Sequence, residues 1–335
     1  MSNRNIRNES NKRKLTSGIA LAGAALLATT LVACSTDEPG NGGGEAGDDT
    51  ITVGYVQAHM TSAFRTEMIR GAEEEAERLG VQLEVFDSNN VVENQNTAIE
   101  TFADKGVDVI VVGSIEAASV VTAIDYAIRK GSAVIAVDLK VDHDGISAQI
   151  GVDNKAGGRA IGEYIVDYAK ENSLELVAGV NIALNNESQN LRLDGFTEVF
   201  EEAGGTIIDT VDSQNIKEQA LAGSENLLTS QQDLPILYAT GEPSLVGSLA
   251  AVKSQNRTGS VTLFGWDVSA EGIEGLDGGY VQAIANQPAF EEGVAAIQTA
   301  VKIAKGESYE KEQILPINII TLENVDPLRS VYIKK

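Results

Sequence analysis

The chain has 335 residues, a single cysteine and two histidines, and its formal net charge at pH 7 is −24. A surface this acidic repels phosphate backbones and anionic lipid headgroups, which argues against nucleic acid binding and direct membrane-surface binding. Because so few histidines and cysteines are available for a metal site or a Ser-His relay, we expect no metal and no cofactor.

The first 33 residues have the features of a secretory signal. Five basic residues precede the apolar run 18–28, which is too short and too rich in alanine to indicate a membrane span. The following Leu31-Val32-Ala33-Cys34 resembles a bacterial lipobox, in which the cysteine is acylated and the chain is cut before it. We therefore expect a lipoprotein signal peptide at 1–33, lipidation of Cys34, and an extracytoplasmic protein anchored to the outer face of the cytoplasmic membrane or in the periplasm. The alternative is an ordinary signal peptide with an incidental buried cysteine.

Residues 34–49 follow this signal and are rich in glycine and acidic side chains, without apolar periodicity. Such a composition predicts a flexible, self-repelling tether between the lipid anchor and a folded body that begins near residue 50.

From residue 51 onward, short apolar runs alternate with amphipathic segments. We predict two rounds of strands, at 51–57, 82–87, 107–112, 133–138 and 149–153, and then at 176–182, 206–211, 235–239, 261–266 and 280–284. Helices are predicted at 65–79, 156–168, 192–203, 216–230, 244–254 and 289–305. Near-continuous Val and Ile runs are typical of strands buried on both faces of a parallel sheet. The pattern therefore predicts an α/β fold with two similar, doubly wound parallel-sheet lobes.

Ligands of open parallel sheets bind beyond the carboxyl ends of the strands, so the residues that follow each strand are the candidate site. In this chain they are rich in Asp, Asn and Gln, which suits a neutral ligand with many hydroxyl groups. Asp138 and Asp267 are the stronger candidates, because each ends a strongly apolar strand. Asp87 and Asp153 could instead be helix N-caps, and Trp266 could be a core residue.

Two enzymatic or nucleotide-binding alternatives are disfavoured by the residues. Two carboxylates could indicate glycoside hydrolysis, but nothing identifies a proton donor. The turn 57–64 has no glycine that would let a pyrophosphate approach the backbone, and the glycines of 157–162 have the wrong spacing for a dinucleotide fingerprint. We expect the latter glycines to ease close helix packing.

Several segments, in this order and spacing, resemble the type I periplasmic binding proteins of the ribose-binding, sugar ABC-transporter class. The resemblance covers about residues 51–324. It rests on Gly71-Ala72-Glu73-Glu74-Glu75-Ala76, Asp87-Ser88-Asn89, Gly106-Val107-Asp108-Val109-Ile110, Val137-Asp138, Val152-Asp153-Asn154, Arg192-Leu193-Asp194-Gly195-Phe196, Gly265-Trp266-Asp267 and Ile284-Ala285-Asn286-Gln287-Pro288.

The resemblance implies two lobes joined by three crossovers, near 153–154, 286–287 and 317–318. The N-terminal lobe would then comprise 50–153 plus 287–317, and the C-terminal lobe 154–286 plus 318–335. It also implies that Asp138 and Asp267 bind sugar hydroxyls and that Phe64 stacks on the sugar ring.

The sequence departs from the ribose-type pattern at several of these positions. Arg65 stands in place of a second aromatic residue, and Leu139 and Asn190 in place of arginines. Asn215 occupies an aromatic position, and Gly241-Glu242 replaces an Asn-Asp pair. These changes leave open another pentose, a hexose, a furanose, a sugar alcohol or a signalling furanone. The predicted ligand-binding residues are Phe64, Arg65, Asp138, Asn190, Asn215, Glu242, Trp266, Asp267 and Asn286.

The sequence therefore predicts a substrate-binding lipoprotein, not an enzyme, which captures a small sugar or polyol by hinge closure and delivers it to an ABC permease. We expect it to act as a monomer. The alternatives are a ligand-sensing receptor for chemotaxis or quorum signalling and, less favoured, a cleft glycoside hydrolase.

Overall fold

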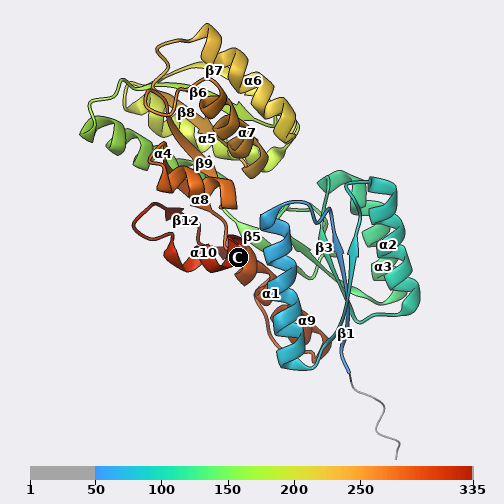
Figure 1. Ribbon diagram of the computed structural model, residues 1–335. Helices are drawn as coiled ribbons and strands as arrows, with labels where there is room; N and C mark the ends of the chain where they lie inside the picture. Colours follow the sequence, from blue (N-terminus) through green and yellow to red (C-terminus); the bar gives the residue numbers. More distant parts are fainter. Residues whose placement is uncertain (1–49, 334–335) are drawn as a thin grey trace, which may run out of the picture. The chain divides into compact units, whose positions relative to one another are not determined.

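The computed structural model describes residues 50–333 (Figure 1). The predictions for the signal peptide, for Cys34 and for the tether fall outside these residues. The first sheet of the described region is parallel throughout, with strand order β11-β5-β4-β3-β1-β2. Its strands are β1 (Thr52–Gln57), β2 (Gln82–Asp87), β3 (Val109–Gly113), β4 (Ala133–Val137), β5 (Ala148–Val152) and β11 (Glu312–Leu315).

The second sheet repeats this arrangement with strand order β12-β10-β9-β8-β6-β7, and only its edge strand β12 runs antiparallel to its neighbour. Its strands are β6 (Val177–Ile182), β7 (Thr206–Asp212), β8 (Ile236–Ala239), β9 (Thr262–Trp266), β10 (Val281–Asn286) and β12 (Asn318–Ile320). The two doubly wound sheets confirm the predicted fold class. The exact lobe boundaries at 153/154, 286/287 and 317/318 remain a prediction.

Helices cover both faces of each sheet. On the first sheet, α1 (Ala63–Leu79) and α9 (Ala289–Ala304) pack on one face, and α2 (Val92–Lys105) and α3 (Val121–Lys130) on the other (Figure 1). On the second sheet, α4 (Asn154–Glu171) and α5 (Glu187–Glu202) cover one face, and α6 (Lys217–Ser230), α7 (Glu242–Ser254) and α8 (Ala270–Asp277) the other. The last helix is α10 (Asp326–Tyr332), and a short 3-10 turn (Ala117–Val120) precedes α3.

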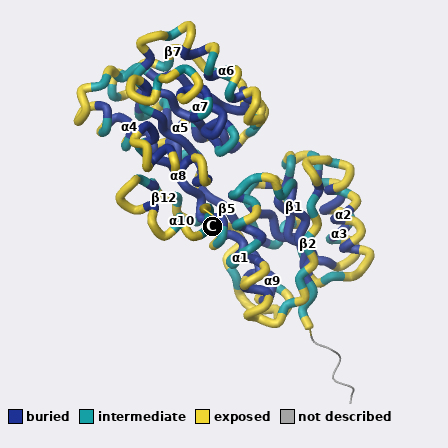
Figure 2. Tube along the Cα trace, viewed as in Figure 1, coloured by how far each residue is buried: buried dark blue, intermediate teal, exposed yellow. Residues whose placement is uncertain are grey.

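The apolar core of each sheet follows from its strand sequences. Every residue of β3, Val109-Ile110-Val111-Val112-Gly113, is buried, because neighbouring side chains point to opposite faces and helices cover both (Figure 2). At about 25 cal/mol per Å² of buried apolar surface, such strands supply the main favourable free energy of folding.

Two helix pairs cross at glycines, where the backbones come very close. A Cβ atom at Gly71 of α1 would overlap the carbonyl oxygen of Phe290 in α9, and one at Gly158 of α4 would overlap that of Arg192 in α5. The prediction that the glycines after Asp153 ease helix packing is therefore confirmed at Gly158. The second crossing also positions Arg192, which lines the site described below.

Several elements were not predicted from the sequence: α2, α3, α8, α10, β11 and β12. The Val91 N-cap of α2 makes no side-chain cap hydrogen bond, so this helix lacks the usual start signal. The two edge strands β11 and β12 are short and largely exposed or half-buried, so they lack the apolar runs of the central strands.

Candidate functional site

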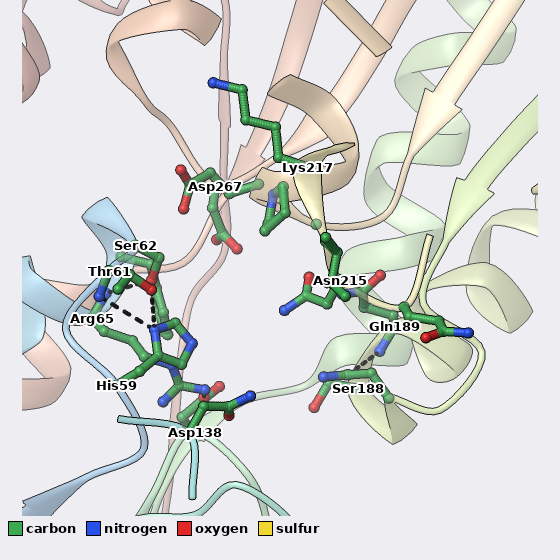
Figure 3. A pocket seen from close by; sticks show the side chains of 18 of the residues that line it. His59, Thr61, Ser62, Arg65, Asp138, Ser188, Gln189, Asn215, Lys217 and Asp267 are labelled. Atoms are coloured by element: carbon green, nitrogen blue, oxygen red, sulfur yellow. Dashed lines mark hydrogen bonds and ion pairs between the residues drawn. The ribbon is translucent and has the colours of Figure 1, made fainter. Parts of the chain in front are cut away.

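A cavity of about 790 Å³ lies at the carboxyl ends of the strands of both sheets. Figure 3 shows side chains around it, including Arg65 from the start of α1, Asp138 from directly after β4, Asn215 from the turn after β7 and Asp267 from directly after β9. The full lining comprises His59, Thr61, Ser62, Phe64, Arg65, Asn89, Asn90, Ser114, Ile115, Asp138, Leu139, Asn185, Asn186, Ser188, Gln189, Arg192, Gln214, Asn215, Ile216, Lys217, Glu218, Gly241, Glu242, Pro243, Val246, Asp267, Glu271 and Gln287. Most of these residues can donate or accept hydrogen bonds.

Asp138 and Asp267 occupy equivalent positions in the two sheets, one residue after β4 and one after β9. Both have left-handed backbones, with φ of 65° and 58°, a conformation that aspartate tolerates better than most residues. The Asp138 N–H donates to the Ile150 carbonyl and the Asp267 N–H to the Ala285 carbonyl, so both residues extend the hydrogen bonding of their sheets. The backbone therefore holds each of the two carboxylates at the carboxyl end of an interior strand of its sheet.

In the first sheet, Asp138 is paired with Arg65. The Arg65 Nη2 atom lies 3.1 Å from Asp138 Oδ2, and both side chains are largely buried. Arg65 Nη1 also donates to Gln57 Oε1 at 2.7 Å, which fixes the guanidinium from the end of β1. The arginine that stands in place of an aromatic residue therefore supplies the partner of the site aspartate.

In the second sheet, Asp267 is only 6% exposed and accepts hydrogen bonds from Gln287 Nε2 at 3.0 and 3.2 Å. Arg192 Nη1 lies 3.8 Å from its carboxylate, and the guanidinium stacks 4.0 Å from the Trp266 ring. Burial raises the pKa of Asp267, while Arg192 and the Gln287 amide oppose the rise. The buried carboxylate is therefore held by Gln287, which follows a strand as the other candidates do, and by Arg192, which was not predicted as a site residue.

Asn215 lies in the turn after β7, again with a left-handed backbone (φ 58°). Its Oδ1 accepts from Gln189 Nε2 at 3.0 Å, while Gln189 Oε1 accepts from the Ala183 N–H and from Thr240 Oγ1. This network orients the Asn215 amide at the wall of the cavity, where its NH2 group is a donor for a ligand hydroxyl.

Glu242 is the first residue of α7 and lines the cavity. Burial raises its pKa to about 7, with the Asp267 and Glu271 carboxylates raising it further. The pKa of His59, which also lines the cavity, is shifted in the opposite direction. Burial, and to a smaller extent the nearby Arg65, lowers it to about 4. His59 is therefore neutral at physiological pH.

Six of the nine predicted ligand-binding residues line the cavity: Phe64, Arg65, Asp138, Asn215, Glu242 and Asp267. The other three lie outside its lining, contrary to expectation.

Each of these three side chains is engaged by the protein itself. Trp266 is fully buried in the core beneath α4, and its Nε1 donates to the Tyr238 hydroxyl, so the core alternative holds for it. Asn190 donates to the Leu184 carbonyl, and Asn286 accepts from the Val268 N–H.

Asp87 and Asp153, which the sequence offered as possible helix N-caps, differ from one another in the structure. Asp153 caps α4, because its Oδ1 accepts from the Ala156 N–H at 2.9 Å. Asp87 caps no helix, and its Oδ1 accepts from the Asn89 N–H in the turn after β2. Neither belongs to the cavity lining, although Asn89 does.

A further carboxyl group, Glu292 on α9, is fully buried, and neither of its oxygens has a hydrogen-bond partner among the described residues. Burial raises its pKa well above the ordinary value, and the Asp138 and Asp267 carboxylates raise it further. The environment therefore favours its protonated form, and it lies within electrostatic reach of both site aspartates. Tyr55, also fully buried with an unpartnered hydroxyl, has its pKa raised by burial and by Glu292.

Replacing Glu292 by leucine is expected to raise the free energy of unfolding at pH 7 by about 1–3 kcal/mol, since it removes an unpartnered buried polar group. Because the pKa is higher in the folded state than in the unfolded chain, the wild-type protein loses stability as pH rises above about 4.5. Glu292→Leu should flatten this part of the pH profile. Urea unfolding at a series of pH values measures both effects, and a variant that is less stable at pH 7 contradicts the argument.

Residues 50–333 were also compared with the requirements of a metal site and of a membrane-spanning helix. No group of three or more His, Cys, Asp or Glu side chains there could hold a metal ion. No helix in the same range combines the length and apolarity needed to cross a bilayer.

Comparisons with known proteins agree with this architecture. A family model described as "Periplasmic binding protein domain" matches residues 53–308. The chain is 28% identical over 275 residues to the ribose import binding protein of Haemophilus influenzae, covering 81% of this chain and 91% of the relative. It is 25% identical over 310 residues to the xylitol-binding protein of Mycolicibacterium smegmatis, covering 92% and 86%.

A solved ABC transporter solute binding protein from Mycobacterium smegmatis superposes with a TM-score of 0.76, at 26% identity, over 83% of this chain and 96% of that one. The family match covers well over half of the chain. The two sheets also have the doubly wound topology that the sequence predicts, with polar residues at the carboxyl ends of their strands. The chain belongs to the periplasmic binding protein family, in the type I class of sugar transporters.

Proposed function

We propose that the protein is the substrate-binding lipoprotein of an ABC importer and captures a small sugar or polyol in the cavity between the two sheets. The observation that carries the proposal is the placement of Asp138 and Asp267 at equivalent strand ends, each beside a guanidinium group. A carboxylate accepts hydrogen bonds from two neighbouring hydroxyls, and a guanidinium donates to others, which matches the pattern on a polyhydroxylated molecule.

The remaining cavity residues suit the same ligand. Phe64 is 8% exposed and lines the cavity, where its ring can contact the C–H face of a sugar. Asn215 adds an amide held by Gln189. A micromolar dissociation constant requires about 8 kcal/mol, which several buried hydrogen bonds and one ring contact can supply.

Similar proteins support this ligand class. The relatives above are named for ribose and for xylitol, and the Mycobacterium smegmatis structure contains glycerol. All three are neutral molecules with several hydroxyl groups.

Capture would proceed by hinge closure at the crossovers between the sheets. Gln287, directly after β10 and next to the predicted crossover at 286–287, binds the site residue Asp267. Ligand contacts from both sheets favour the closed state, because a ligand shifts a conformational equilibrium by its difference in affinity. The closed protein would present a joined surface to the permease, while the lipid on Cys34 and the acidic segment 34–49 keep it near the membrane.

A thermal-shift screen against pentoses, hexoses and sugar alcohols tests the proposal, because a ligand that binds only the folded state raises the melting temperature. We expect at least one member of the panel to raise it and to bind with one-to-one stoichiometry in calorimetry. The same mixtures should contain no new product after prolonged incubation. Turnover of a glycoside would instead support the hydrolase alternative, and the absence of any shift would refute the proposed ligand class.

A further inference from the structure

The cations that line the cavity are each committed to a protein partner. Arg65 binds Gln57 and pairs with Asp138. Lys217 Nζ lies 3.7 Å from Glu271 Oε1, and both side chains are about half exposed.

Arg192 is the most heavily engaged of the three cations. Its Nε donates to Asn154 Oδ1 at 2.8 Å and its Nη1 to the Thr240 carbonyl at 2.9 Å, in addition to its approach to Asp267. His59 contributes no charge, because burial lowers its pKa to about 4.

Glu242, by contrast, forms no ion pair among the described residues, and the one hydrogen bond to its carboxyl group comes from the Ala63 backbone. Its Oε2 atom is buried and has no hydrogen-bond partner among the described residues. The charged groups that act on it most strongly are two carboxylates, Asp267 at the end of β9 and Glu271 on α8. Two weaker interactions lower the pKa of Glu242: a hydrogen bond from the backbone N–H of Ala63 at the start of α1, and the charge of Lys217 on α6. The cavity therefore contains a buried carboxyl oxygen that no described group of the protein satisfies.

We propose that the captured ligand carries a primary amine in addition to hydroxyl groups, as in an amino sugar or an amino polyol, and that its ammonium group binds Glu242. The inference rests on the proposed function and narrows its ligand class. An ammonium group has three N–H donors and no acceptor, which complements a carboxylate with a free buried oxygen. Such charge-assisted hydrogen bonds are about twice as strong as neutral ones.

The protonation state of Glu242 provides an independent readout. With a pKa of about 7, the carboxyl is partly protonated at neutral pH, because burial and two carboxylates disfavour its charged form. A bound ammonium group favours the ionised form, so binding releases a fraction of a proton. Tyr332 lies within electrostatic reach of Glu242, but its own pKa is raised above the ordinary value by burial, so it does not titrate near neutrality.

The test compares matched ligand pairs by calorimetry at pH 7: glucosamine with glucose, galactosamine with galactose, 1-amino-1-deoxysorbitol with sorbitol, and 2-amino-1,3-propanediol with glycerol. We expect the amine of at least one pair to bind about tenfold more tightly than its parent, as suits a charge-assisted contact. Titrations in buffers of different ionisation enthalpy should show proton release for that amine. In Glu242→Gln, both the preference and the proton release should disappear.

A matched control is Glu274→Gln, which removes a carboxylate from α8 that pairs with Lys253 outside the cavity. It should retain the preference. If neutral sugars or polyols bind and none of the amines binds more tightly, the amine inference is wrong and the proposed function stands. An amine preference that survives in Glu242→Gln also overturns it. If neither class binds, both the inference and the proposed function fail.

Discussion

Substituting Asp267 by alanine is expected to weaken sugar or polyol binding about 100-fold, because the variant loses a buried acceptor of two ligand hydroxyls and leaves those donors unpaired. The unfolding free energy of the ligand-free protein should fall by only about 1 kcal/mol. Two effects of the substitution on this free energy offset each other. The raised pKa of Asp267 shows that its charge is costly in the folded state, while alanine is less tolerant of the left-handed backbone at this position.

Asp267→Asn separates these two effects. Asparagine tolerates the same backbone, so this variant should unfold like the wild type and still bind more weakly, because the amide replaces one acceptor by a donor. Asp233→Ala, at an exposed aspartate outside the cavity lining, is the matched control and should bind normally. Calorimetry and thermal unfolding measure both quantities. Unaltered affinity in Asp267→Ala would remove this residue from the proposed site.

Gly71→Val is expected to destabilise the protein by about 4 kcal/mol or more, because the new side chain has no space at the α1–α9 crossing. The first added carbon would already overlap the Phe290 carbonyl oxygen, which belongs to the backbone of α9 and cannot rotate away. The converse contact exists at Gly293, where a Cβ atom would overlap the Met68 carbonyl oxygen. Relief of both contacts would require the two helices to separate along their length.

Glu73→Val provides the control for that substitution, since it places the same β-branched side chain at an exposed position of α1 only two residues away. It should change the unfolding free energy by about 0.5 kcal/mol, the usual size of a surface effect. Urea unfolding of both variants tests the argument. Similar midpoints for the two would show that the crossing can relax, and would contradict the close approach of the helices.

The fold was predictable from the sequence because the central strands are strongly apolar and the principal helices are amphipathic. The predicted strand at 133–138 contains β4, an interior strand of the first sheet, and the predicted helix at 65–79 lies within α1. The short edge strand β11 escaped prediction because a four-residue segment with alternating exposure has no distinctive pattern. Its place in the sheet depends on pairing with β5, some 160 positions earlier.

The site was only partly predictable, because the rule used to find it considers residues at strand ends. That rule led to Asp138 and Asp267, which follow strands and line the cavity, whereas Asn215 was reached only through the resemblance to the ribose-binding class. Arg192 was missed because it lies within α5 and reaches the site through the close packing of α5 against Gly158 of α4. Trp266 was misassigned because strand alternation directs it into the core, one residue before the aspartate that faces the cavity.

The late position of β11 has a consequence for how the chain acquires its structure during synthesis. The first sheet contains residues from 52 to 315, and α9, which covers one of its faces, begins only at Ala289. A ribosome must therefore produce nearly the whole chain before the N-terminal half can complete its sheet or cover that face. Such distant pairings slow folding, because the long loop must close before the contacts form that stabilise it. Completion of the first sheet is therefore expected to be one of the last steps of folding.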